Sequence, residues 1–246
     1  MTGRVAFVTG GAGGIGSAIC RHLAEAGHRL AVADVSAEAA AEVAAQVGGV
    51  AVEVDVTDPD SCRAAVSGAV ESLGAIDVLV SCAGWDELIP LVDTDEDFQH
   101  KVLEINLGGP IRLTRMVLPG MIERRWGRIV TIASDAGRVG SSLEAIYSGA
   151  KGGLIAFTKT VAREVARHGI TANVVCPGPT DTPLLAGIVA ANPDSDRVIA
   201  SMTKSVPMRR LGTPDDIAPA VVYFASEAAA FTTGQTLSVS GGLTMA

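Results

Sequence analysis

The chain places Thr9-Gly10-Gly11-Ala12-Gly13-Gly14-Ile15-Gly16 directly after the apolar run Val5-Ala6-Phe7-Val8 and before an amphipathic segment. The glycines at positions 11, 13 and 16 have the G-x-G-x-x-G spacing of a strand–turn–helix that binds a dinucleotide. Glycine lets the backbone approach a pyrophosphate, and the following helix offers free N–H groups at its N-terminus. This stretch therefore predicts a phosphate-binding turn with cofactor contacts from Gly10, Ala12, Gly13, Gly14, Ile15 and Gly16.

Beyond this turn, short apolar runs alternate with longer amphipathic segments. We expect strands at Val5–Thr9, Leu30–Asp34, Val50–Asp55, Asp77–Ser81, Gly127–Ala133, Thr171–Cys176 and Thr236–Val239. We expect helices at 14–26, 36–47, 58–73, 95–125, 147–168 and 214–226. The strands are mostly apolar without strict alternation, which is typical of a sheet covered on both faces. The pattern predicts an α/β fold: a Rossmann-type, doubly wound, seven-stranded parallel sheet flanked by helices, formed by residues 1–246 as a single domain.

Composition narrows the class of protein. Of 246 residues, 48% are hydrophobic and 19% charged, which is a globular composition, and the net charge of −8 argues against nucleic-acid binding. The four cysteines have no C-x-x-C spacing and the four histidines form no metal motif, so we expect reduced thiols and no metal site. We see no signal peptide and no run long enough to span a membrane, and we expect a cytoplasmic protein.

Carboxylates at the ends of two predicted strands bear on the cofactor. Asp34 lies eighteen residues after Gly16, where it would accept hydrogen bonds from the ribose hydroxyls of NAD and repel the 2′-phosphate of NADP. Val35 follows and offers no cation, so we expect NAD or NADH. Asp34 could instead cap the next helix, although Ser36 is the better cap. Asp55-Val56 could flank the adenine or simply form a turn.

A second constellation carries the chemistry. Tyr147 and Lys151 are four positions apart on a predicted helix and share a face. A phenol titrates near 10 in water, and a nearby ammonium favours the phenolate. Ser134 ends the fifth predicted strand, where its hydroxyl could stabilise charge developing on a substrate oxygen. Asn106 lies inside an apolar helical run, so either a backbone kink or a bound water serving Lys151 is plausible.

Together these motifs resemble the short-chain dehydrogenase/reductase family over the whole length of the chain. The matching positions are the glycine turn, Ala83-Gly84, Asn106, Ser134, Tyr147-x-x-x-Lys151 and Pro177-Gly178-x-x-x-Thr182. The resemblance implies hydride transfer at nicotinamide, with Tyr147 as acid/base, Ser134 polarising the carbonyl, Lys151 binding ribose and lowering the tyrosine pKa, and Asn106 supporting a water. It also implies cofactor contacts from Cys82, Ala83, Gly84, Tyr147, Lys151, Pro177, Gly178, Thr180 and Thr182.

One position departs from the family pattern. The family usually has asparagine where this chain has Cys82, and a thiol is only a weak hydrogen-bond donor. We expect this departure to change cofactor affinity modestly and the reaction type not at all.

Several segments of the chain resemble one group of enzymes more closely, and this resemblance indicates a class of substrate. Ala83-Gly84-Trp85-Asp86, the segments 132–142 and 173–182, and the C-terminal 237–245 are similar to NAD-dependent dehydrogenases of cyclic hydroxyacyl-CoA thioesters. This implies interconversion of a secondary alcohol and a ketone. Substrate contacts are expected from Trp85, Asp135, Arg138, Ser142 and Leu184. The alternatives are a general carbonyl reductase, a 3-oxoacyl thioester reductase, which Asp34 disfavours, and a dinucleotide-sensing protein without catalysis.

Two further expectations concern larger features. The stretch 178–212 is rich in Pro, Asp, Ser and Thr and reads as irregular, and we expect a substrate lid at about 183–212. The alternative is a surface excursion with a short helix. The resemblance also implies a homotetramer formed through the helices at 95–125 and 147–168 and through the C-terminal segment.

Overall fold

Seven parallel strands form the centre of the computed structural model, which describes residues 3–190 and 195–245. In space the strands follow the order β3-β2-β1-β4-β5-β6-β7. Their bounds are β1 Val5–Thr9, β2 Arg29–Asp34, β3 Val50–Glu53, β4 Val78–Ser81, β5 Gly127–Ile132, β6 Ile170–Pro177 and β7 Thr236–Val239. Chain order reverses beside β1, so β1 and β4 form the switch point of the sheet. In sheets of this kind ligands bind in a crevice at the carboxyl ends of the strands on either side of that point.

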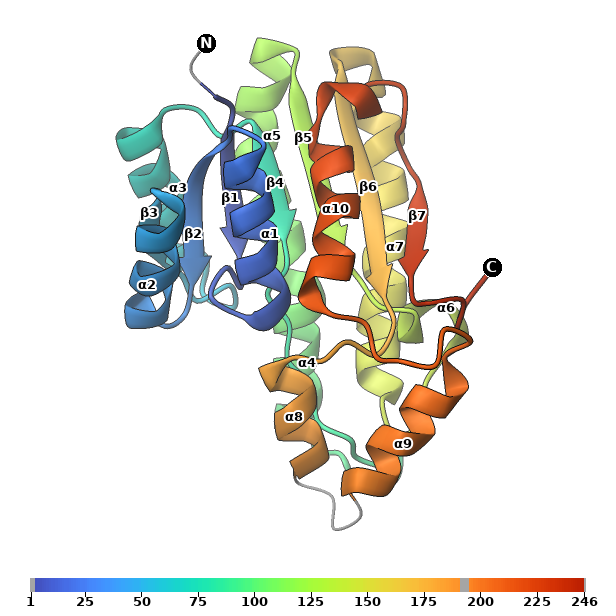
Figure 1. The fold of residues 1–246 in the computed structure, drawn as a ribbon. Coiled ribbons are helices and arrows are strands. Elements are labelled where there is room, and N and C mark those ends of the chain that lie inside the picture. The colour runs from blue at the N-terminus through green and yellow to red at the C-terminus, as the bar shows by residue number, and fades with distance from the viewer. Residues whose placement is uncertain (1–2, 191–194, 246) are drawn as a thin grey trace.

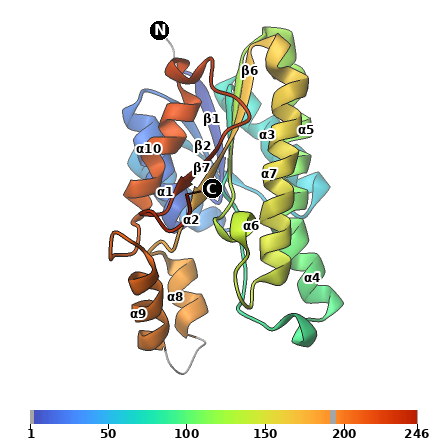
Figure 2. The same ribbon diagram turned by 90° about the vertical axis from the view of Figure 1, so that its right-hand side faces the viewer.

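Helices cover both faces of the sheet, as Figure 2 shows with the sheet seen nearly edge-on. One face carries α1 Gly14–Glu25, α2 Ala37–Val47 and α10 Pro214–Ala225, and the other carries α3 Pro59–Leu73, α5 Gly109–Arg124 and α7 Ala145–Val165. Alternate residues of β1 divide between the two cores: Ala6 and Val8 pack toward α1, and Val5 and Phe7 toward α5 and α7. All five residues of β1 are buried, which explains the absence of polar alternation in its sequence.

The predicted helix at 95–125 is divided into three parts. α4 Glu96–Leu103 leads into a π-helical turn, η2 Glu104–Gly108, and α5 follows from Gly109. Such π turns widen a helix locally and occur often at functional sites. Asn106 lies inside η2, so the backbone departs from regular α-helical geometry at this residue.

The segment 178–212 is more regular than its composition indicates. It contains α8 Pro183–Ala190 and α9 Ser195–Ser205, so the expectation of an irregular stretch was wrong. Apolar residues dominate α8, although Val189 is the only one of them that is buried. In Figure 1 both helices project beyond the carboxyl ends of the strands. Residues 191–194 of the expected lid lie outside the described residues.

The remaining elements are short. They are α6 Ala136–Val139 and the 3₁₀ turns η1 Leu91–Asp93, η3 Ala166–His168 and η4 Glu227–Ala229. Among the described residues, no helix is both long enough and apolar enough to cross a bilayer.

Candidate active site

The glycine turn is shaped by backbone contacts that leave no room for side chains. Gly10 has a φ of +62°, and a Cβ there would lie 2.8 Å from the Cα of Ala83. A Cβ on Gly16 would lie 1.9 Å from the carbonyl oxygen of Gly10. The turn can close this tightly only with glycine at both positions, and it leaves the N-terminus of α1, which begins at Gly14, facing the crevice.

The loop after β6 meets this turn from the other side of the crevice. A Cβ built on Gly14 would come within 3.0 Å of both Thr182 and Pro183. Thr182 Oγ1 accepts a hydrogen bond from Leu185 N (3.2 Å), which fixes the threonine at the start of α8. The structure therefore brings together the two predicted cofactor segments, which lie far apart in the sequence.

The same loop is fixed to β7. Gly178 N donates to Val239 O (3.1 Å), and Thr180 Oγ1 donates to Gly178 O (2.9 Å). A Cβ on Gly178 would lie 2.7 Å from the Cβ of Ser240. Pro177 ends β6, so the loop leaves the sheet at the carboxyl edge as the cofactor prediction requires.

Asp34 ends β2 and holds the glycine turn. Its Oδ2 accepts from Ala12 N (3.0 Å) and its Oδ1 from Ser36 N (3.2 Å). Ser36 is the cap of α2, accepting from Ala39 N (3.3 Å), as the sequence indicated. Val35 is 68% exposed beside it. The carboxylate thus lies at the edge of the crevice next to the phosphate-binding turn, where a ribose would pass.

Asp55 and Val56 make contacts within the protein. Asp55 Oδ1 accepts from both Thr57 N (2.8 Å) and Thr57 Oγ1 (2.7 Å), which is the turn-forming alternative. The Val56 side chain is buried against Gly109 at the start of α5. Contacts from these two residues to the adenine stay a prediction.

The Thr9 hydroxyl is a structural group that sequence reasoning did not single out. It is 1% exposed and accepts hydrogen bonds from Cys82 N (3.1 Å) and Ala83 N (3.3 Å), joining the ends of β1 and β4. Burial raises the pKa of the Cys82 thiol to about 12, so the thiol stays protonated. A polar residue closing an otherwise buried apolar strand was the available signal for Thr9.

Lys151 and Tyr147 share one face of α7, as predicted. Lys151 Nζ donates to Ile132 O (3.0 Å) at the end of β5 and lies 5.4 Å from the centroid of the Tyr147 ring. The lysine is 3% exposed, and burial lowers its pKa to about 8. Lys151 therefore loses its charge more readily than a lysine in water.

The pKa of Tyr147 departs from the sequence expectation. Burial raises it, the nearby Glu144 and Asp86 carboxyls raise it further, and interaction with the Ser134 hydroxyl opposes them. Desolvation of the phenolate outweighs any help from Lys151 in this arrangement, so the expected lowering was wrong for the chain alone. Ser134 Oγ accepts from Ala136 N (3.1 Å), which leaves its proton available for a substrate oxygen.

Asn106 faces the same space. Its Nδ2 donates to Trp85 O (2.7 Å) and Val102 O (2.9 Å), and its buried Oδ1 has no hydrogen-bond partner among the described residues. A Cβ built on Gly84 would lie 3.1 Å from this Oδ1 and 3.6 Å from Lys151 Nζ. The unpaired acceptor and the lysine therefore border a common space in front of Gly84, which fits a bound water or a cofactor hydroxyl.

Two of the predicted substrate residues are engaged with β7. Asp135 is 4% exposed and accepts from the Ser238 hydroxyl, to which Arg138 Nη1 also donates (2.6 Å). Both side chains thus tie the start of α6 to β7, and their contacts with substrate stay a prediction. Sequence reasoning could not find this contact, because Ser238 lies 103 positions after Asp135.

The other three substrate predictions are placed differently. Trp85 packs edge-on against Phe98 with centroids 5.8 Å apart, and Lys101 Nζ lies 3.4 Å from its ring. Ser142 is exposed before α7, and Leu184 is 41% exposed on α8. Trp85 is therefore held against α4, and the contacts of all three with substrate stay a prediction.

A nicotinamide dinucleotide fits the residues present. The turn at 10–16 is a cradle that Cβ atoms would fill, and the unpaired Oδ1 of Asn106 is a vacant acceptor beside Lys151. Asp34 contacts the same turn at Ala12, and Thr182 lies against it at Gly14.

Comparison with known proteins identifies the family to which the chain belongs. Residues 10–244 match a family described as enoyl-(acyl carrier protein) reductase. The chain is 37% identical to 3-oxoacyl-[acyl-carrier-protein] reductase of Vibrio cholerae, covering 100% of this chain and 99% of that protein. It is 39% identical to nodulation protein G of Azospirillum brasilense, covering 99% of each. The chain therefore belongs to the short-chain dehydrogenase/reductase family of oxidoreductases.

A solved structure agrees with this assignment. An actinorhodin polyketide ketoreductase, a substituted form with NADPH, superposes with a TM-score of 0.94 at 36% identity, covering 98% of this chain and 97% of that chain. The predicted Rossmann-type fold is confirmed.

Proposed function

We propose that the protein is a ketoreductase that interconverts 3-oxoacyl and 3-hydroxyacyl thioesters with NADH. The observation that carries the proposal is the convergence of Ser134, Tyr147, Lys151 and the free Oδ1 of Asn106 at the carboxyl edge, beside the glycine turn. Similarity to a 3-oxoacyl-[acyl-carrier-protein] reductase and to a polyketide ketoreductase supports the thioester class over a general carbonyl reductase.

The chain's own residues supply binding and proton transfer. When bound, the cofactor supplies the hydride that reduces the ketone carbon. Ser134 would donate a hydrogen bond to the ketone oxygen, stabilising the negative charge that develops there. Tyr147 would then give its hydroxyl proton to that oxygen, yielding the alcohol, and the reverse steps oxidise it. Lys151 would hold the cofactor ribose, and Asn106 Oδ1 would hold the water through which Tyr147 regains its proton.

A ring-bearing substrate is the second candidate. Residues Gly84–Asp86 and the segments around Ser134 and Pro177 resemble 2-hydroxycyclohexanecarboxyl-CoA dehydrogenase. In that substrate the hydroxyl carbon is adjacent to the carbon bearing the thioester, so it is a 3-hydroxyacyl thioester closed into a ring. The two candidates therefore share one reaction and differ in acyl shape and carrier.

Asp34 supports NADH over NADPH. Its carboxylate ends β2 beside the glycine turn, and a 2′-phosphate would meet this negative charge. The ketoreductase neighbour was solved with NADPH, which makes the comparison of both cofactors essential. We expect Asp34→Ser to lower the ratio of the affinity for NADH to the affinity for NADPH by on the order of tenfold, which corresponds to about 1.4 kcal/mol.

The test is oxidation of NADH and NADPH by purified protein with 2-oxocyclohexanecarboxyl-CoA, acyclic 3-oxoacyl thioesters of CoA and of acyl carrier protein, and free cyclohexanone. Turnover of thioesters with little of the free ketone supports the proposal. Preference for free ketones, or inactivity of every thioester, would replace it with a general reductase or with a non-catalytic dinucleotide-binding protein. The ring and acyclic arms separate the two candidates.

The shape of the molecule supports two further parts of the proposal. We infer that α8 and α9 form the substrate lid, because they project past the carboxyl edge and Thr182 anchors their start beside the glycine turn. We also infer a homotetramer formed through α4, α5 and α7. Exposed Leu103 and Ile111 and the open surface at Gly149 support it. Light scattering on the purified protein measures its oligomeric state.

A further inference from the structure

The turn that carries Ser134 is held from two sides. Ser134 lies between the end of β5 and α6, which is a helix of only 4 residues. A helix this short is not stable by itself, so contacts with other elements must hold it. On the side of α7 the two backbones touch, because a Cβ built on Gly137 would lie 2.7 Å from Gly152 N. α6 therefore lies directly against the part of α7 that follows Lys151.

On the other side of α6, a single hydroxyl of β7 contacts both ends of the turn. Ser238 Oγ donates to Asp135 Oδ1 and accepts from Arg138 Nη1 (2.6 Å). Asp135 directly follows Ser134, and Arg138 lies within α6. A serine hydroxyl can donate one hydrogen bond and accept others, so Ser238 uses both capacities on the same turn.

The Asp135 carboxyl depends on this contact. Asp135 is 4% exposed, and its Oδ2 has no hydrogen-bond partner among the described residues. If the Ser238 hydroxyl were removed, neither oxygen of this buried carboxyl would have a hydrogen-bond partner among the described residues. An unpaired buried polar group is costly, so the carboxyl would move toward water. Such a movement would displace Ser134, because the two residues are adjacent in the chain.

Backbone hydrogen bonds connect Asp135 to the groups expected at the reaction centre. Asp135 N donates to Pro177 O (3.1 Å), at the start of the loop for which cofactor contacts are predicted. Ala136 N, the next donor along the chain, donates to Ser134 Oγ (3.1 Å). The direction of the Ser134 hydroxyl is therefore set by the same turn that Ser238 holds.

We propose that Ser238 is a positioning residue for Ser134: it holds Asp135 and Arg138 so that the Ser134 hydroxyl faces the substrate oxygen. This inference rests on the proposed function, in which Ser134 donates to the ketone oxygen. Ser238 acts through the turn and does not itself touch substrate. Because small displacements of a catalytic group slow the chemical step, loss of Ser238 should reduce the rate and leave cofactor binding unchanged.

β7 also supplies a matched control. Thr236 lies two positions before Ser238, so both side chains point to the same face of the strand. The Thr236 hydroxyl is buried and has no hydrogen-bond partner among the described residues. Thr236→Val therefore removes a hydroxyl from this face without breaking a described hydrogen bond. Ser238→Ala removes the contacts with Asp135 and Arg138, whereas Ser238→Thr keeps the hydroxyl.

Kinetics test whether Ser238 acts through Ser134. We expect Ser238→Ala to lower kcat for thioester reduction by on the order of tenfold, with KM and NADH affinity within about twofold of the parent. Ser238→Thr should restore most of the rate, and Thr236→Val should keep it. In a Ser134→Ala background, Ser238→Ala should cost less than about twofold more, because the residue through which it acts is gone. A full tenfold loss in that background, or an unchanged kcat in Ser238→Ala, would overturn the inference.

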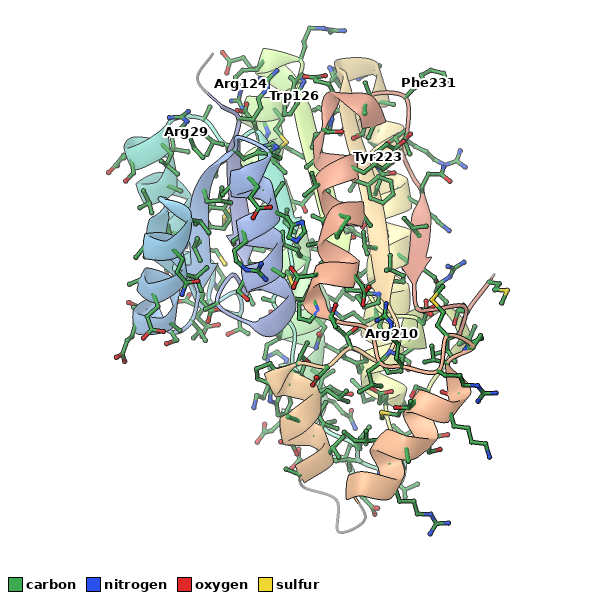
Figure 3. The ribbon with its side chains drawn as sticks, in the orientation of Figure 1. Arg29, Arg124, Trp126, Arg210, Tyr223 and Phe231 are labelled. Carbon is green, nitrogen blue, oxygen red and sulfur yellow. The ribbon has the colours of Figure 1, made fainter. Side chains whose placement is uncertain are left out.

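Hydrogen exchange tests the inference without substrate. Measured by mass spectrometry, exchange in residues 134–139 should be about tenfold faster in Ser238→Ala than in the parent or in Thr236→Val. Peptides around Trp126, which lies at the opposite end of β5 and away from α8 and α9 (Figure 3), should exchange at the parental rate in every variant.

The outcomes separate the inference from the proposed function. Unchanged exchange in residues 134–139 would overturn the inference, and so would equally faster exchange around Trp126, because the whole fold would then be loosened. An inactive parent protein contradicts the proposed function and leaves hydrogen exchange to decide whether Ser238 holds the turn.

Discussion

The two sides of the crevice are built by different means. The glycine-loop side, formed by β1, residues 10–16 and the end of β2, is fixed by backbone atoms packed so closely that a Cβ has no place at Gly10 or Gly16. The catalytic side, formed by the ends of β4 and β5, η2 and the start of α7, is fixed by buried polar side chains with displaced pKa values. The first side determines that a dinucleotide binds, and the second determines how readily a proton moves.

This difference predicts separable effects of substitution. Changes on the catalytic side should alter rate and pH dependence while cofactor binding persists. Changes on the glycine-loop side should alter stability and cofactor affinity together, because the same backbone contacts serve both.

The largest effect is expected from Tyr147→Phe. Removal of the acid hydroxyl should lower kcat by on the order of a thousandfold, because proton transfer to the substrate oxygen loses its donor. NADH binding, measured by fluorescence titration, should stay within about twofold of the parent, since phenylalanine keeps the ring and the glycine turn and Lys151 are unchanged. A comparable loss of NADH affinity would show that the two sides are not separable.

Lys151 gives the pH dependence of stability. Its pKa is about 8 when folded and 10.5 in the reference state, so between these values the unfolded chain binds more protons. The free energy of unfolding should therefore rise with pH across this window, by up to about 3 kcal/mol from this residue. In the Lys151→Met variant the free energy of unfolding should change less with pH across this window. Urea unfolding at several pH values measures this dependence. Equal slopes in both proteins would contradict the assignment.

Gly16→Ala tests the glycine-loop side. The new Cβ would meet the Gly10 carbonyl oxygen at 1.9 Å, so the backbone must move. We expect a loss of about 1–3 kcal/mol in unfolding free energy and a matching weakening of NADH binding. Gly68→Ala is the control, because a Cβ on Gly68 of α3 meets nothing within 4 Å. A variant that is destabilised yet binds NADH normally would break the link between the two properties.

The smallest effect is expected from Thr9→Val, which keeps the side-chain shape but removes the acceptor for Cys82 N and Ala83 N. Leaving these N–H groups without their partner should cost about 1–2 kcal/mol of stability, measured by urea unfolding. Because Thr9 joins the strands that carry the two sides, NADH binding and turnover should both weaken slightly. If only NADH binding or only turnover changed, the glycine-loop side and the catalytic side would be independent of each other at β1 and β4.

The sequence was most informative where the backbone restricts the residue type. All seven strands were predicted within one or two residues at most ends, since runs buried on both faces read as apolar, and the glycine turn needed glycine at Gly10 and Gly16. Prediction failed where three-dimensional context decides. The two helices within 178–212 were missed because the Pro, Asp, Ser and Thr residues of this stretch are typical of irregular structure. The contact of Asp135 with Ser238 joins residues 103 positions apart. The direction of the Tyr147 pKa depends on burial and on Asp86, which spacing alone does not reveal.

The contact between Gly14 and Thr182 has a consequence for the order of assembly. One partner belongs to the first helix of the chain and the other follows the sixth strand, so the dinucleotide pocket closes only after most of the sheet has formed. A nascent chain released before β6 has no complete pocket to offer. A nicotinamide dinucleotide would then be a ligand of the finished protein alone, and its binding would stabilise the folded chain by mass action.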